Sequence, residues 1–137
     1  MIVIYAVEGN PTDQQRAINH RASLELAGHR FVISNLTMTE CLTPLFGHGA
    51  GDRLSSFFRF FQGPNLRTVD LTAAMHLRAS SIRSRQFHAT AAFAKPKRYS
   101  LPDAIHLAAA IESGCDVFLT NDNQLATFPD ITIEELP

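Results

Sequence analysis

The sequence has little of what marks disulfide-rich, membrane-spanning or strongly basic proteins. Its 2 cysteines, Cys41 and Cys115, are too few and too scattered for a disulfide framework or a zinc motif, so we expect both thiols to be reduced packing residues. No apolar run approaches the roughly 18 residues of a membrane-spanning helix, and no secretory signal is visible. The formal net charge is −1, which excludes an overall positive charge as a means of binding nucleic acid. We expect a cytoplasmic protein.

The residues that are present are typical of a single globular domain. Of the 137 residues, 45% are hydrophobic and 18% are charged, so the chain can bury one core and is too apolar to be disordered. Short apolar strands are predicted to alternate with helices. Strands are expected at residues 31–34, 66–70, 116–120 and 131–133, and helices at 10–27, around 39–42 with a break at Pro44, at 53–62, at 72–94 with a break near 83–86, and from Ser100 onward. This order predicts an α/β fold, a three-layer α/β/α sandwich with a parallel central sheet, formed by residues 1–137 as one domain.

Three acidic residues stand at junctions between strands and helices. Glu40 follows the strand at 31–34, Asp122 lies just past the strand at 116–120, and Asp103 opens the helix that leads into that strand. Ligands of open α/β sheets gather at the carboxyl ends of strands, and a few carboxylates suffice for a hard divalent cation. Each acid also has a structural interpretation, because Asp103 favours a helix dipole, Asp122 suits a turn, and a lone Glu is usually a surface residue. Taken together, the three predict one pocket with carboxyl groups within roughly 8 Å of one another.

Four segments resemble, in order, successive motifs of the PIN domain, and most of all the VapC-like toxins of bacterial toxin–antitoxin pairs. They are residues 5–11, 33–40, 101–108 and 118–122. The resemblance implies a Rossmann-like α/β/α sandwich that cleaves RNA with Mg²⁺ or Mn²⁺ and pairs with an antitoxin protein. It also implies that Glu40, Asp103 and Asp122 are the second, third and fourth metal-binding and catalytic acids of the family. Thr120 matches the family's Thr before the last acid, where its hydroxyl would help hold that carboxylate or the phosphate.

The resemblance fails at the first acid, which the family carries at the end of its first strand. Aligned through Gly9–Pro11, the chain begins after the point where that Asp belongs. Either the first strand and its acid precede Met1, or residues 1–5 form a shifted strand and Glu8 approaches the pocket. The close match at Gly9–Pro11 favours the first alternative, and we then expect weak Mn²⁺-dependent activity.

Two further functions compete with that of a toxin ribonuclease. The first is a catalytically impaired PIN-fold protein that binds RNA or an antitoxin without cutting. The second is a flavodoxin-like module that binds a ligand or accepts a phosphoryl group. The chain lacks a glycine-rich phosphate loop, which counts against the second of these.

Basic and aromatic residues give weaker indications. Lys95, Lys97 and Arg98 form the only basic cluster, either a solvated loop or a contact for an RNA backbone. His106, one turn beyond Asp103, is expected to be a packed or partly exposed helix residue, the alternative being that it faces the site as a proton shuttle or a partner of a ligand. Four phenylalanines between residues 57 and 61 cannot all face inward on one helix, so we expect a second copy of the chain or an antitoxin to cover some of them. We predict a homodimer through apolar residues of the helix at 53–62 or of its neighbours.

Overall fold

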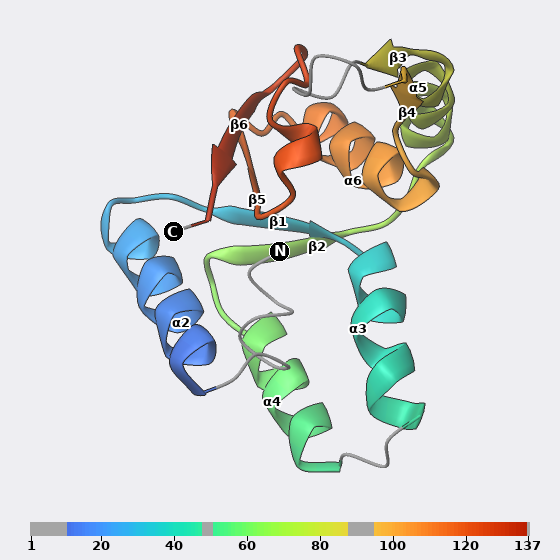
Figure 1. Cartoon of the computed structure of the whole chain (residues 1–137). Helices are drawn as coiled ribbons and strands as arrows, with labels where there is room; N and C mark the ends of the chain where they lie inside the picture. The colour runs from blue at the N-terminus through green and yellow to red at the C-terminus, as the bar shows by residue number, and fades with distance from the viewer. Residues whose placement is uncertain (1–10, 48–50, 88–94, 137) are drawn as a thin grey trace.

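The computed structural model describes residues 11–47, 51–87 and 95–136. Helices and strands alternate along this part of the chain (Figure 1). In chain order the elements are α2 (Pro11–Leu26), β1 (Phe31–Ser34), α3 (Leu36–Gly47), α4 (Gly51–Phe61), β2 (Leu66–Val69), α5 (Ala73–Ser84), β3 (Gln86–Phe87), β4 (Lys97–Arg98), α6 (Leu101–Glu112), β5 (Val117–Thr120), the 3₁₀ turn η1 (Asn123–Leu125) and β6 (Thr132–Glu135).

The long strands of the described residues pair in parallel. β1 lies beside β2 with Phe31 opposite Leu66, and β5 lies beside β6 with Val117 opposite Thr132. A short antiparallel ribbon joins β3 to β4. Helices α2, α3 and α4 lie on one side of β1 and β2, and α5 and α6 lie on the other (Figure 1). This arrangement is the predicted α/β class, since parallel strands need crossover connections that place helices on the faces of the sheet.

Two glycines end the helices that precede β1 and β5. Gly28 follows α2 with φ +87°, and the amide of His29 donates to the carbonyl of Leu24. Gly114 follows α6 with φ +74°, and the amide of Cys115 donates to the carbonyl of Ala110. Both ends are Schellman motifs, in which glycine adopts a left-handed conformation at little steric cost. The predicted end of the first helix at Gly28 is confirmed.

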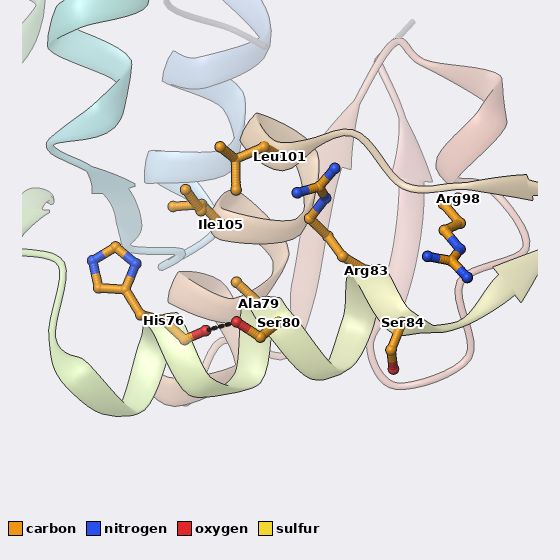
Figure 2. A pocket seen from close by; sticks show the side chains of 8 residues that line it. All are labelled: His76, Ala79, Ser80, Arg83, Ser84, Arg98, Leu101 and Ile105. Carbon is orange, nitrogen blue, oxygen red and sulfur yellow. Dashed lines mark hydrogen bonds between the residues drawn. The ribbon is translucent and has the colours of Figure 1, made fainter.

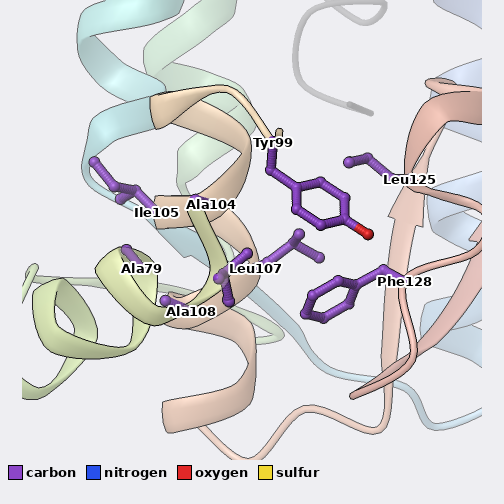
Figure 3. Close-up of a cluster of buried hydrophobic side chains, with 9 residues drawn as sticks. Ala79, Tyr99, Ala104, Ile105, Leu107, Ala108, Leu125 and Phe128 are labelled. Atoms are coloured by element: carbon purple, nitrogen blue, oxygen red, sulfur yellow. The ribbon is translucent and has the colours of Figure 1, made fainter. Parts of the chain in front are cut away.

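The main core forms where α6 meets α5 and the aromatic residues around it. Leu107 is fully buried, and Tyr99 meets Phe128 edge-on with ring centroids 5.4 Å apart (Figure 3). Tyr99 also stacks on Phe87, with ring centroids 4.4 Å apart. Four alanines of α6 are also buried, at positions 104, 108, 109 and 110. Their short side chains let the neighbouring elements approach α6 closely. A second, smaller cluster between α3 and α4 centres on Cys41 and Phe57.

The predicted break at Pro44 is wrong, because α3 continues to Gly47. Pro44 has no N–H to donate to the carbonyl of Glu40, a loss that ordinarily costs about 3 kcal/mol in a helix interior. Here Cys41 is buried and Met38 and Leu42 pack against the same cluster, which offsets that loss.

Three other local predictions can be compared with the structure. The break near residues 83–86 is confirmed, since α5 ends at Ser84 and Arg85 has extended backbone angles. Residues 88–94, predicted to be helical, lie outside the described residues. On α4, Phe57 is buried and Phe58 is 49% exposed, so the expectation that not all of these rings face inward is confirmed. No helix within the described ranges is both long and apolar enough to cross a membrane.

Replacing Leu107 with Ala should lower the free energy of unfolding by about 2–5 kcal/mol, because it leaves a cavity at the centre of the core. Leu77→Ala is the matched control, since Leu77 is 75% exposed on α5 and its truncation should change stability by less than about 0.5 kcal/mol. Urea unfolding of both variants measures the difference. Equal losses in the two variants would contradict the described core.

Candidate active site

The three predicted acids lie on separate elements. Glu40 is in the second turn of α3, directly after β1; Asp103 is in the first turn of α6; Asp122 lies two residues after the end of β5. α3 and Asp122 each follow the carboxyl end of a parallel strand, and α6 packs against β1. The backbone therefore carries Glu40 and Asp122 past strand ends, as expected for a ligand site of an open α/β sheet.

A buried histidine ties Glu40 to the helix that carries Asp103. His106 Nε2 lies 2.7 Å from Glu40 Oε2, and His106 Nδ1 lies 3.0 Å from Ser34 Oγ. The side chain of His106 is 10% exposed and that of Glu40 is 28% exposed. His106 and Asp103 are three residues apart on α6 and so lie on neighbouring positions of one helix face. The contact brings Glu40 to the same end of α6 as Asp103.

The order serine, histidine and acid is also the order of a hydrolase triad, in which the serine is the nucleophile. Ser34 is 4% exposed at the end of β1, so its hydroxyl is buried away from solvent. A nucleophilic hydroxyl has to reach the substrate. The geometry therefore supports a role for Ser34 in holding His106 and argues against serine hydrolase chemistry.

Asp103 takes part in the cap of α6. The hydroxyl of Ser100 donates to Asp103 Oδ2 and accepts a hydrogen bond of 3.2 Å from the Asp103 amide. This reciprocal pair satisfies an N-terminal amide of the helix, and the carboxylate favours the positive end of the helix dipole. The structural interpretation of Asp103 therefore holds, but it uses only one of the two carboxylate oxygens.

Asp122 is held by the turn that follows β5. Its Oδ1 accepts a hydrogen bond of 2.9 Å from the amide of Gln124, and its own amide donates to Thr120 Oγ1 at 3.0 Å. Thr120 is buried, and its hydroxyl contacts the backbone of Asp122, whereas the resemblance implied a contact with the carboxylate or a phosphate. Thr120 thus fixes the turn that carries Asp122.

Each of the three carboxylates has one oxygen bound within the protein. Among the described residues, Glu40 Oε1, Asp103 Oδ1 and Asp122 Oδ2 have no hydrogen-bond partner. Oxygen donors of this kind suit Mg²⁺ or Mn²⁺, which take carboxylate ligands and keep several waters. The donor chemistry fits such an ion.

The described residues nevertheless contain no group of three or more His, Cys, Asp or Glu side chains that together could hold a metal. Contacts in the described part of the chain link Glu40 to α6, and none links Asp122 to either of the other acids. Glu8, the alternative to the missing first acid, lies outside the described residues.

A basic groove, which was not predicted from the sequence, lies beside the start of α6. Its volume is about 410 Å³, and its walls include Arg83 of α5, Arg98 of β4, and Leu101 and Ile105 of α6 (Figure 2). Within the described ranges neither arginine has a carboxylate partner, whereas Arg78 and Arg85 pair with Glu112 and Asp130. The basic cluster predicted from the sequence is exposed here, and Lys97 and Arg98 form β4. The groove combines an apolar wall with two guanidinium groups that no carboxylate of the described residues neutralises.

The two cysteines do not extend the site. Cys41 is buried in the smaller core cluster. Burial raises the pKa of the Cys115 thiol, Arg67 lowers it and Asp116 raises it again, with burial the largest effect. A protonated thiol is neither a nucleophile nor a metal ligand at neutral pH, so Cys115 remains the packing residue that the sequence predicted.

The fold and these residues define an α/β domain with acidic side chains at the carboxyl ends of its parallel strands. The sequence matches the PIN domain family over residues 2–131, and the chain belongs to that family. Its structure is similar to a chain in the crystal structure of VapBC2 from Rickettsia felis bound to a DNA fragment from their promoter. That likeness has a TM-score of 0.71 at 17% sequence identity and covers 99% of this chain and 94% of the other. A search of curated proteins found no match. The predicted family and fold class are confirmed.

Proposed function

We propose that this chain is a metal-dependent endoribonuclease that hydrolyses RNA phosphodiesters, and that it is the toxin of a toxin–antitoxin pair. The observation that carries the proposal is the contact between Glu40 and His106, which brings acids of two separate elements to one end of α6 in a PIN domain. The Rickettsia felis structure supports an antitoxin partner by analogy, because the chain that is similar to this one was crystallised as part of a VapBC complex.

In this proposal Glu40, Asp103 and Asp122 hold Mg²⁺ or Mn²⁺ through the oxygens that have no partner in the described chain. When bound, such an ion acidifies water and neutralises charge on the phosphodiester. The protein's own contribution is to fix the carboxylates. Ser100 orients Asp103, the amide of Gln124 orients Asp122, and Thr120 secures the turn beneath Asp122. A side-chain nucleophile is not required.

A catalytically impaired PIN protein that binds RNA or an antitoxin is the second candidate. Two observations favour it: the described residues do not form a group of three metal ligands, and Asp103 and Asp122 each use a carboxylate oxygen in the cap of a helix or turn. The two candidates differ in whether the carboxylates matter for cleavage or only for folding.

Glu40→Gln, Asp103→Asn and Asp122→Asn should each lower Mn²⁺-dependent cleavage of a single-stranded RNA by about 100-fold or more, equivalent to about 2.7 kcal/mol of transition-state stabilisation. Asp116→Asn is the matched control, because Asp116 precedes β5 at the amino end of the strand that Asp122 follows. Glu8→Gln tests whether that residue replaces the first acid. RNA binding without any cleavage by the unmodified chain would instead support the impaired alternative.

The groove between α5 and the start of α6 is proposed to bind the RNA backbone, with Arg83 and Arg98 contacting phosphates and Lys95 and Lys97 lying nearby. Direct RNA contact by Thr120 is a weaker proposal, since its hydroxyl is buried against Asp122. Leu101 and Ile105 supply an apolar wall against which a base can lie.

Arg83→Ala and Arg98→Ala should each weaken RNA binding and reduce the slope of log affinity against log salt by about 0.7, the value for one phosphate contact on a single strand. Arg30→Ala removes the same charge at the amino end of β1 and should leave the slope unchanged. Fluorescence anisotropy over a range of salt concentrations measures both. Equal changes in RNA affinity and salt slope in all three variants would show a non-specific effect of charge and contradict RNA binding in the groove.

The homodimer remains a proposal, and Phe58, which has an exposed ring on α4, supports it. Light scattering at micromolar concentration should give about twice the 15.1 kDa of one chain. Phe58→Ser should shift the mass toward the monomer, whereas Leu26→Ser, at a position 90% exposed on α2, should not. A mass of 15.1 kDa for the unmodified chain would rule out the dimer.

A further inference from the structure

The hydrogen-bonded chain from Ser34 through His106 to Glu40 has no role in the proposed chemistry so far. It joins three elements, the end of β1, the second turn of α6 and the second turn of α3. Ser34 is 4% exposed and the His106 side chain 10% exposed, while the Glu40 side chain at the other end is 28% exposed. These two hydrogen bonds therefore connect the interior to the surface and end at Glu40, a proposed metal ligand.

We propose that His106 is a positioning residue, which fixes Glu40 so that Oε1 is presented to the metal while Oε2 is held by the ring. The inference rests on the proposed function, because it gives Glu40 a metal to bind. Metal-binding groups are commonly oriented by such outer partners, and removing the partner weakens metal binding.

The directions of the two hydrogen bonds follow from the donors available. A carboxylate can only accept, so His106 Nε2 carries the proton donated to Glu40 Oε2. In the neutral ring Nδ1 then has a lone pair and accepts from the hydroxyl of Ser34. Glu40 thereby selects the tautomer with its proton on Nε2, and the hydroxyl of Ser34, which can donate or accept, supports the ring in that orientation.

Glu40 needs this support more than an ordinary helical glutamate does. Pro44 stands four residues later and offers no N–H to the carbonyl of Glu40, so α3 lacks one of its own hydrogen bonds at this residue. A glutamate side chain also has several rotatable bonds and loses rotamer freedom when it is ordered. A bond from the rigid, mostly buried ring of His106 restricts those rotations before a metal binds.

Isothermal titration calorimetry with Mn²⁺ alone, on the full chain, tests the proposal without relying on activity. His106→Leu should weaken Mn²⁺ binding by about 10-fold, the lower end of the range for loss of an orienting partner. His106→Gln should bind within about 3-fold of the unmodified chain, because its amide can donate to Glu40 in place of the ring. The Mn²⁺ affinity of Ser34→Ala should lie between those of His106→Leu and His106→Gln. Arg78→Gln is the matched control, since it breaks a different contact between two helices, the ion pair with Glu112, which does not involve the three acids.

The outcomes separate positioning from simple stabilisation. If His106 only joins α3 to α6, His106→Leu will lower stability in urea but leave the Mn²⁺ affinity unchanged, and the proposal is overturned. If His106→Leu does not fold, the Mn²⁺ affinity of Ser34→Ala is the test, and an affinity equal to that of the unmodified chain overturns the proposal. If Glu40→Gln also leaves Mn²⁺ binding unchanged, the metal site itself is wrong and the proposed function fails with it. Weakening by His106→Leu with recovery in His106→Gln supports the proposal.

Discussion

The close packing of α6 against β1 and α5 is the constraint on which the candidate site depends. α6 presents four buried alanines and the fully buried Leu107, so its backbone lies close to its neighbours and has little room to shift. Its N-terminal turn then fixes Asp103, and one turn later His106 reaches both Ser34 and Glu40. A change that moved α6 would therefore move Asp103 and break the hydrogen bond between His106 and Glu40.

The same helix explains why the site and the stability of the fold are difficult to separate. Asp103 is part of the cap of α6, and Asp122 is part of the turn after β5, so each acid stabilises the backbone that carries it. A carboxylate has two oxygens, and in each case one is used for this purpose. Capping and metal binding are therefore compatible. Substitution by the isosteric amide, which retains a carbonyl oxygen for the cap, is the appropriate way to distinguish them.

Much of the fold follows from local sequence. The run Phe31–Ser34 is predicted and observed as a strand, because β-branched and aromatic residues favour a half-buried pleated surface. Gly28 ends α2 where the sequence predicts, because a left-handed residue is needed there. Pro44 misled the prediction because its local cost is outweighed by burial of Cys41, and that burial depends on packing against α4, a separate helix.

The site is less predictable than the fold. The positions of the three acids beyond strands or at a helix start can be read from the sequence, but their contacts cannot. Local sequence predicts that His106 is packed, since it lies between Ile105 and Leu107, yet its partner Glu40 is 66 residues away. Arg83 likewise gives no signal, because its proximity to Arg98 arises from the pairing of β4 with β3, the strand that follows α5. These contacts are set by tertiary structure, which no local pattern encodes.

The central claim is that Glu40, Asp103 and Asp122 bind one divalent ion together. Mn²⁺ is paramagnetic and broadens the nuclear magnetic resonance signals of nearby amides, so a titration followed in ¹⁵N-labelled protein tests the claim without a substrate. The account predicts that the amides of all three residues broaden together at low Mn²⁺, while those of Arg30 and Asp116, at the amino ends of β1 and β5, remain sharp. Broadening confined to one of the three acids, or stronger broadening around Asp116, would contradict it.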